Sequence, residues 1–268
     1  MNHKPQPLLG VSVLIPRAPG RGQKLAHRIE AAGGQAILAP LISRGPLNAK
    51  QSEELKVEVK RLLSGEYAWT ALTSVNAIFE LEKAANDLAQ ELRTAQTKWV
   101  AVGPATEHSL RDIGIEATFV APHNSALGML AVWPHAQSEF EKVLLPLGNL
   151  AAATLEEGLV KKGYEPVRVT AYHTLSHPAP PEVISRWRGG NFDAVILTSG
   201  SVVRELHEQF GIQGNVGAIA IGEPTKKAAL ELHQPVLGVA VNATDDALFD
   251  ALLKAVPDIH SMRGHTST

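Results

Sequence analysis

The sequence Ala101-Val102-Gly103-Pro104-Ala105-Thr106 returns later in the chain as Ala220-Ile221-Gly222-Glu223-Pro224-Thr225. In each copy a short apolar run that favours a β-strand ends at Gly, and a Pro near the start of the following segment favours a helix beginning. Two further segments recur in the same order: residues 12–16 return as 142–146, and residues 73–74 return as 198–199. The three repeated segments occur in the same order in both halves and have matching predicted secondary structure, which indicates an internal duplication.

Apolar runs of strand length alternate with helical stretches along the chain. Strands are predicted at residues 11–15, 35–39, 68–73, 98–102, 142–145, 166–171, 192–198, 216–221 and 236–241. Helices are predicted between them, among others at residues 23–32, 75–92, 154–162, 202–210 and 224–232. Because parallel strands need crossover connections, and helices cover both faces of such sheets, this pattern predicts an α/β fold of two similar doubly wound parallel-sheet domains.

Composition excludes several classes of protein. The 268 residues are 44% hydrophobic and 19% charged, which is typical of a globular protein and not of a disordered or coiled-coil one. Lys and Arg number 25 against 27 Asp and Glu, so the net charge of −2 argues against a general nucleic-acid binder. The absence of cysteine excludes disulfides and thiolate metal sites and fits a cytoplasmic protein. No apolar run is long enough for a membrane span, so we expect no membrane partner.

Two extended, Pro-marked passages occupy matching places in the two halves, at residues 40–47 and 172–181. Pro and the residue before it favour extended backbone, so we interpret both passages as crossings between the domains. They predict an extended two-stranded linker. The polar segment 257–268 has no apolar period and is expected to be an irregular terminus.

Six strand-to-helix junctions share one chemistry, each being rich in Gly, Ser, Thr, Asn or Pro. They are residues 16–22, 73–76, 103–106, 148–154, 198–201 and 222–225. In a parallel sheet these junctions lie at the carboxyl edge, where the unpaired amides of the first helical turn attract anions. Such residues are also ordinary helix N-caps in any α/β protein, so both interpretations stay open. If two domains face each other, a cleft between them would suit a substrate with several carboxylates.

A few side chains near these junctions suggest more specific roles. Arg17, between Pro16 and Pro19 at a strand exit, is the preferred partner for a carboxylate because its guanidinium is planar. Lys226 either binds the same kind of anion or belongs to a solvated helix face. Tyr172 either donates a proton to a leaving group or packs as an interface aromatic. No dinucleotide, P-loop or metal-binding motif is complete, so we expect neither cofactor nor metal.

These landmarks together resemble the uroporphyrinogen-III synthase family. The resemblance is carried by residues 16–19, 72–77, 101–106, 143–146, 171–174, 197–202 and 221–225, and it spans about residues 11–254. It implies a two-lobed α/β protein in which residues 1–40 and 176–268 form one discontinuous domain and residues 43–172 form an inserted one. The chain departs from the family pattern at Leu147, where many members have Arg, and at Pro16, where Thr is common.

The resemblance also implies a reaction and a set of site residues. The reaction is cyclisation of hydroxymethylbilane, a linear tetrapyrrole with eight carboxylates, to uroporphyrinogen III, with loss of water and inversion of ring D. This is a cofactor-free lyase step of heme and other tetrapyrrole biosynthesis, expected here from a cytoplasmic monomer. By matching motifs, the substrate carboxylates would meet Thr73, Ser74, Asn76, Gly103, Thr106, Thr198, Ser199, Gly222 and Thr225. Arg17 and Lys226, because of their place near the junctions, are added to this set as candidate carboxylate partners. Tyr172 would be the catalytic acid.

Two other functions compete with this hypothesis. A non-enzymatic two-lobed anion-binding module would share the junctions but would need no proton donor. A regulatory protein derived from the synthase fold would be expected to carry a DNA-binding domain, and only about a dozen residues follow Lys254. We therefore prefer the enzyme.

Overall fold

The computed structural model describes residues 6–264, and the chain divides into two compact units. Unit 1 contains the described residues up to Ser43 and from Leu175 onward, and unit 2 is Arg44–Thr174. The chain leaves unit 1 along strand β3 (Ile42–Gly45) and returns along the end of the long strand β8 (Glu165–Ser176). Both segments are extended, as the Pro-marked passages predict.

The sheet of unit 1 has the strand order β11-β10-β9-β1-β2 within the described residues. Its strands are β1 (Ser12–Ile15), β2 (Gln35–Leu38), β9 (Ala194–Leu197), β10 (Gly217–Ala220) and β11 (Val236–Val239). Every neighbouring pair is parallel. The central strands are fully buried, whereas the edge strands β2 and β11 are not. Helices cover both faces of these central strands, and their residues are apolar except for Ser12 at the start of β1.

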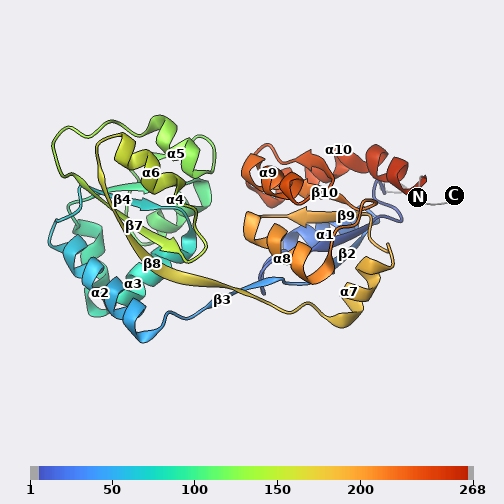
Figure 1. Cartoon of the computed structure of the whole chain (residues 1–268), viewed down its shortest axis with the longest axis horizontal. Helices are drawn as coiled ribbons and strands as arrows, with labels where there is room; N and C mark the ends of the chain where they lie inside the picture. Colours follow the sequence, from blue (N-terminus) through green and yellow to red (C-terminus); the bar gives the residue numbers. More distant parts are fainter. Residues whose placement is uncertain (1–5, 265–268) are drawn as a thin grey trace. The chain divides into compact units, whose positions relative to one another are not determined.

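The two faces of this sheet carry separate sets of helices (Figure 1). Helices α1 (Gln23–Ala31) and α10 (Asp245–Gly264) pack on the face that includes Val13 and Ile15. Helices α7 (Pro181–Arg188), α8 (Gly200–Phe210) and α9 (Glu223–Glu231) pack on the opposite face, where Leu14 points. Neighbouring residues of β1 thus enter different cores, as the alternation of a strand requires.

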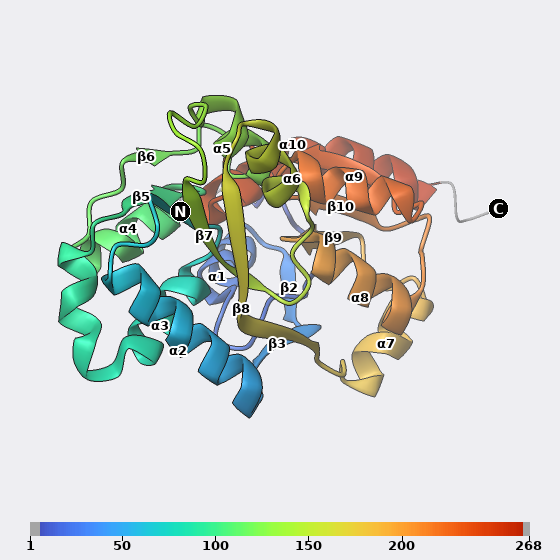
Figure 2. The same ribbon diagram turned by 60° about the vertical axis from the view of Figure 1, so that its left-hand side comes forward.

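The sheet of unit 2 has the order β3-β8-β7-β4-β5-β6. Its other strands are β4 (Trp69–Leu72), β5 (Lys98–Ala101), β6 (Phe119–Val120) and β7 (Lys142–Gly148). One face is covered by α2 (Ala49–Leu63), α3 (Val75–Ala85), the 3-10 helix η1 (Asn86–Thr94) and α4 (Pro104–Asp112). The other is covered by α5 (Ala126–Val132) and α6 (Thr154–Lys161), and Figure 2 gives a second view of these helices.

The two sheets share one topology once β3 is set aside. Strands β8-β7-β4-β5-β6 of unit 2 correspond in order to β2-β1-β9-β10-β11 of unit 1. The repeated segments fall on corresponding elements, since residues 142–146 lie on β7 and residues 12–16 on and just after β1. The predicted α/β class with parallel sheets and two domains is confirmed.

One expectation about the end of the chain is wrong. The segment from Pro257 onward, expected to be irregular, continues α10 as far as Gly264. The helix persists because Ile259 is 1% exposed in the core and Arg263 binds Asp193 and the carbonyl oxygen of Gly10. Residues 265–268 lie outside the described part of the chain. Among the described helices none is both long and apolar enough to cross a membrane.

Candidate functional site

The six predicted junctions all lie at the carboxyl ends of parallel strands. The rim of unit 1 is formed by residues 16–22 after β1, 198–201 after β9 and 222–225 after β10. The rim of unit 2 is formed by residues 73–76 after β4, 103–106 after β5 and 148–154 after β7. In each sheet there is one pair of neighbouring strands from which the chain connections run toward opposite edges of the sheet. This reversal lies between β1 and β9 in unit 1, and between β7 and β4 in unit 2. Ligands of open α/β sheets bind beside such a reversal.

Two serines cap the helices next to these reversals. Ser74 is the N-cap of α3, and its hydroxyl accepts the N–H of Asn76 at 3.1 Å. Ser199 is the N-cap of α8, and its hydroxyl accepts the N–H of Val202 at 3.3 Å. Together with the half-buried Thr73 and Thr198, they leave hydroxyls and first-turn amides at the surface of each rim. Both the capping role and an anion-binding role are therefore compatible with this geometry.

Two glycines begin α4 and α9. Gly103 and Gly222 are extended, with φ of 179° and 180°, and Pro follows each in the first helical turn. They differ in what covers them. A Cβ on Gly103 would lie 2.3 Å from Oδ1 of Asn124, whereas a Cβ on Gly222 would meet nothing nearer than Pro224 Cδ at 3.9 Å. The backbone of Gly222 is thus open to a ligand, and that of Gly103 is covered by a side chain.

The threonines of the same junctions lie deeper than the prediction implied. Thr106 and Thr225 are 4% and 5% exposed, and their amide groups donate to the carbonyl oxygens of Gly103 and Gly222 at 3.1 Å. Their side chains are therefore part of the packing beneath the rims. A ligand at these junctions would meet the exposed backbone ahead of them.

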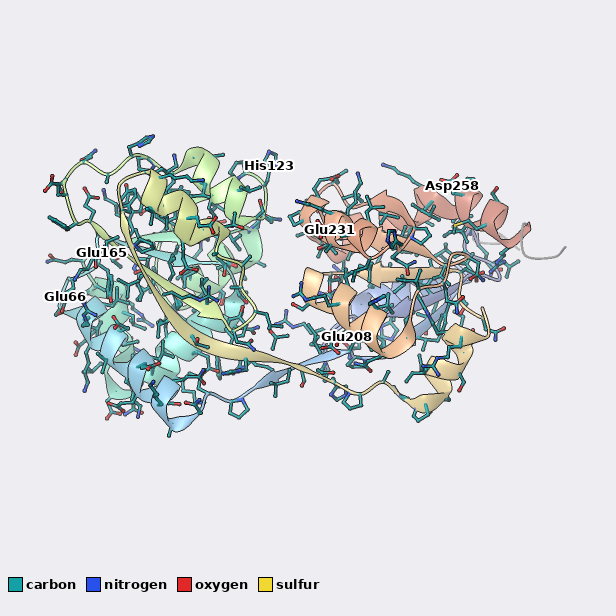
Figure 3. The ribbon with its side chains drawn as sticks, in the orientation of Figure 1. Glu66, His123, Glu165, Glu208, Glu231 and Asp258 are labelled. Atoms are coloured by element: carbon teal, nitrogen blue, oxygen red, sulfur yellow. The ribbon has the colours of Figure 1, made fainter. Side chains whose placement is uncertain are left out.

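The predicted cations are already paired. Arg17 lies at the exit of β1, and its guanidinium forms an ion pair with Asp245 at the start of α10, with side-chain exposures of 17% and 23%. The Nζ of Lys226 lies 3.4 Å from Oε1 of Glu223. Lys226 also lines a shallow hollow of about 400 Å³ along α9. Glu231, the last residue of α9, lines the same hollow and is labelled in Figure 3. Neither Arg17 nor Lys226 is a free cation, so a substrate carboxylate would have to compete with a protein carboxylate for either one.

Arg204 is a rim cation that the sequence analysis did not identify. Its Nη1 lies 3.6 Å from the position of a Cβ on Gly200, the first residue of α8. Arg204 is exposed, and within residues 6–264 it forms no ion pair. The four-residue spacing from Gly200, which places both on one helix face, is the signal in the sequence that could have identified it.

Tyr172 lies on β8 at the level where β7 ends. Its half-buried ring contributes to the core of unit 2, and three of its ring and hydroxyl atoms lie against Gly148. Among the described residues its hydroxyl has no hydrogen-bond partner. The ring is thus packed in the core of unit 2, and the role of Tyr172 as a proton donor stays a prediction.

The predicted site residues divide between the two units. Unit 2 holds Thr73, Ser74, Asn76, Gly103, Thr106 and Tyr172, whereas unit 1 holds Arg17, Thr198, Ser199, Gly222, Thr225 and Lys226. Within each unit they belong to one sheet edge. Across the part of the chain that the structure describes, no grouping of His, Asp and Glu suits a metal ion.

Comparison with known proteins identifies one family. The family model described as uroporphyrinogen-III synthase HemD matches residues 23–250. The uroporphyrinogen-III synthase of Synechococcus elongatus is 23% identical over 266 residues, covering 94% of this chain and 96% of that protein. The Escherichia coli uroporphyrinogen-III synthase is 24% identical over 259 residues, covering 90% and 100%. A crystal structure of a mutant uroporphyrinogen III synthase from Thermus thermophilus has the same fold, with a TM-score of 0.69 at 20% identity over 92% of this chain and 99% of that one.

Proposed function

Because the chain belongs to the uroporphyrinogen-III synthase family, we propose that it converts hydroxymethylbilane to uroporphyrinogen III in tetrapyrrole biosynthesis. The observation that carries this proposal is the extent of the family match, which runs through both units from residue 23 to residue 250. The reaction closes a ring and releases water, so the enzyme is a lyase.

Each rim binds carboxylates of this substrate. The substrate has eight carboxylates, and the rims offer first-turn amides and hydroxyls next to Ser74, Ser199 and the open backbone of Gly222. Helix N-termini favour negative charge, and a hydrogen bond to a carboxylate is stronger than one between neutral groups. On the rim of unit 1, Arg204 adds a positive charge that no described carboxylate neutralises, and Arg17 can exchange Asp245 for a substrate carboxylate.

Tyr172 donates the proton that the departing hydroxyl needs. The proton passes from the phenol to the hydroxymethyl oxygen, the C–O bond of ring A breaks, and water leaves. The azafulvene cation that remains is attacked by the substituted carbon of ring D, and the resulting spiro-pyrrolenine fragments and recloses. On final closure the ring carbon that formed the new bond releases one proton to solvent, and the phenolate of Tyr172 takes up one proton from solvent, so the phenol is restored and the protons balance. The hydroxyl without a partner among the described residues and the ring held in the core suit this role.

The larger part of catalysis is positional. Unassisted closure occurs at the free carbon of ring D and gives isomer I, so the protein must bring the substituted carbon within reach instead. Fixing the substrate through several carboxylates lowers the entropy cost of that geometry. Rims built mainly from amides and hydroxyls on rigid sheet edges fit a task of this kind.

The alternatives considered from the sequence are not favoured. The Synechococcus elongatus and Escherichia coli relatives, which match nearly the whole chain, are named as synthases and not as a binding module or a regulator. We propose in addition that the protein acts in the cytoplasm as a monomer, without nucleic acid. The proposed location rests on the absence of cysteine, the proposed lack of a nucleic-acid partner rests on the net charge of −2, and the proposed monomer follows from the family resemblance.

The test is a product analysis. The protein is incubated with freshly prepared hydroxymethylbilane, and the oxidised products are separated by chromatography into isomers I and III. The proposal expects isomer III to dominate, with Tyr172→Phe lowering kcat about 100-fold, as loss of a general acid does. Formation of isomer I alone, at the rate seen without protein, would refute the synthase function.

A further inference from the structure

The pairing of β7 with β8 breaks at Tyr172. Leu147 lies opposite Thr170, but Gly148, the next residue of β7, lies opposite Tyr172, so one residue of β8 is skipped. Such a bulge redirects the side chains on the bulged strand. Here the irregularity places Tyr172 directly across from a residue that has no side chain.

The phenol ring rests on the backbone of Gly148. A Cβ on Gly148 would lie 2.8 Å from Cε2, 2.9 Å from Cζ and 3.1 Å from Oη of Tyr172, and these are the three atoms nearest to it. The backbone of Gly148 lies outside the left-handed region, so its conformation does not require glycine. The requirement is steric, because any larger residue would displace the hydroxyl end of the ring.

Asn149 holds strand β8 at Tyr172 and two residues beyond it, at Thr174. Its backbone N–H donates to the carbonyl oxygen of Tyr172 at 3.1 Å, and its Oδ1 accepts the N–H of Thr174 at 2.8 Å. Its Nδ2 donates to the carbonyl oxygen of Thr174 at 3.5 Å. These bonds replace the regular ladder at the point where β7 has ended. The backbone of Tyr172 is thereby fixed at the last pair of the two strands.

A third contact anchors the residue that follows Tyr172. The Nε2 of His173 lies 2.8 Å from Oε1 of Gln51 in the first turn of α2. The same oxygen accepts the N–H of Asn48 at 3.2 Å, so His173 is the donor. The backbone at Tyr172 is therefore held by Asn149, and the next residue, His173, is held by its side-chain contact with α2.

From these contacts we propose that Gly148 and Asn149 are positioning residues that set the direction of the Tyr172 hydroxyl. Gly148 supplies the space in which the ring lies, and Asn149 fixes the backbone that carries it. This inference rests on the proposed role of Tyr172 as the acid. Both residues act through Tyr172 and need not touch the substrate.

Gly148→Ala tests the steric part. The methyl group must push the phenol away, and displacement of a reacting group by about an ångström costs about 100-fold in rate. We expect kcat to fall about 100-fold with KM nearly unchanged, in a protein whose circular dichroism matches that of the wild type. Gly214→Ala is the matched control, since a Cβ there meets nothing within 4 Å. An unchanged kcat in folded Gly148→Ala would overturn the inference.

A double-mutant cycle separates positioning from a general structural effect. In the Tyr172→Phe background no hydroxyl remains to be positioned, so Gly148→Ala should lower kcat by less than about threefold there, well short of additivity. A full additional 100-fold loss in that background would contradict the proposal. If Tyr172→Phe alone leaves kcat unchanged, the acid role in the proposed function is the part that fails.

Asn149 supplies an independent arm if Gly148→Ala does not fold. Asn149→Asp retains the acceptor for the N–H of Thr174, whereas Asn149→Ala loses it. We expect Asn149→Asp to keep most of the wild-type kcat and Asn149→Ala to lose at least tenfold, again only when Tyr172 is present. Equal rates for the two variants would overturn the role of Asn149.

Discussion

Gly222→Ala tests whether a substrate carboxylate binds at the rim of unit 1. Gly222 is the N-cap of α9 and has an extended backbone that alanine adopts without strain. The added methyl would meet nothing nearer than 3.9 Å, so the folded protein accommodates it. Because Ala is a poorer N-cap than Gly, we expect a loss of only about 0.5 kcal/mol in the free energy of unfolding.

The effect on binding should be much larger. The methyl group would occupy the open space above the first-turn amides of α9, into which a carboxylate must come to accept their hydrogen bonds. A hydrogen bond to a charged group contributes about 1.5–3 kcal/mol. Loss of one such bond corresponds to an increase in KM of about 10- to 100-fold. The value of kcat should change little, because the proposed acid, Tyr172, belongs to unit 2.

The assay is the steady-state formation of isomer III over a range of hydroxymethylbilane concentrations. Thermal unfolding of the same samples verifies that stability is retained, and Gly214→Ala controls for replacing an unobstructed glycine. A KM within a factor of two of the wild type, in a folded protein, would mean that no carboxylate approaches Gly222. The assignment of the rim of unit 1 to substrate binding would then be wrong.

Three further predictions concern charge. Arg204→Ala should raise KM about tenfold, as loss of one charged hydrogen-bond donor does. Because salt screens the attraction between exposed charges, this increase in KM should be smaller at high salt. An increase in KM that does not depend on salt would argue against a substrate carboxylate as the partner of Arg204. Asp193→Ala should lower the free energy of unfolding, measured by urea denaturation, by about 2 kcal/mol, because the backbone N–H of Ser12 loses its acceptor at 2.7 Å and the partly exposed Arg263 loses its ion pair with Asp193. The control is Glu231→Ala at an exposed position. Equal losses of stability in the two variants would contradict the prediction. Burial raises the pKa of Glu141, but hydrogen bonds from two backbone amides and a hydroxyl outweigh it, so the pKa lies below its ordinary value. The ionised Glu141 therefore stabilises the folded protein above the ordinary carboxyl pKa, and this stabilisation is lost as the pH falls through the lowered pKa. Glu141→Gln should accordingly reduce Tm at about pH 6 and not at about pH 2. A reduction of the same size at both pH values would refute the stabilising role of the Glu141 carboxylate.

The fold class was predictable from the sequence because it depends on local patterns. Apolar runs of strand length alternate with amphipathic helices, and a parallel doubly wound sheet is the arrangement that buries both faces of such strands. The segment after Pro257 was not predictable in this way. It remains helical because Arg263 reaches Asp193, 70 positions earlier in the chain. The internal duplication stays a prediction, supported by the common strand order of the two sheets.

The candidate site was predictable as a set of positions and less so as a set of contacts. The capping serines and the two glycines lie where the junction motifs placed them, because an N-cap and the helix it begins are local features. The prediction that Arg17 is available for a substrate missed its ion pair with Asp245, a residue 228 positions away. The depth of Thr106 and Thr225 was also invisible in the sequence, since burial depends on what packs above them.

The sequence by itself determined which residues end strands, which begin helices, and which of the resulting junctions are candidates for binding anions, because each of these properties depends on a few neighbouring residues. Only the tertiary structure decided that Tyr172 lies against Gly148, that Asn124 covers Gly103 while Gly222 stays open, and that Arg204 meets no carboxylate among the described residues. The physical reason is that strand order and register bring together residues that are distant in the chain. Short-range patterns carry no information about which distant side chains will meet.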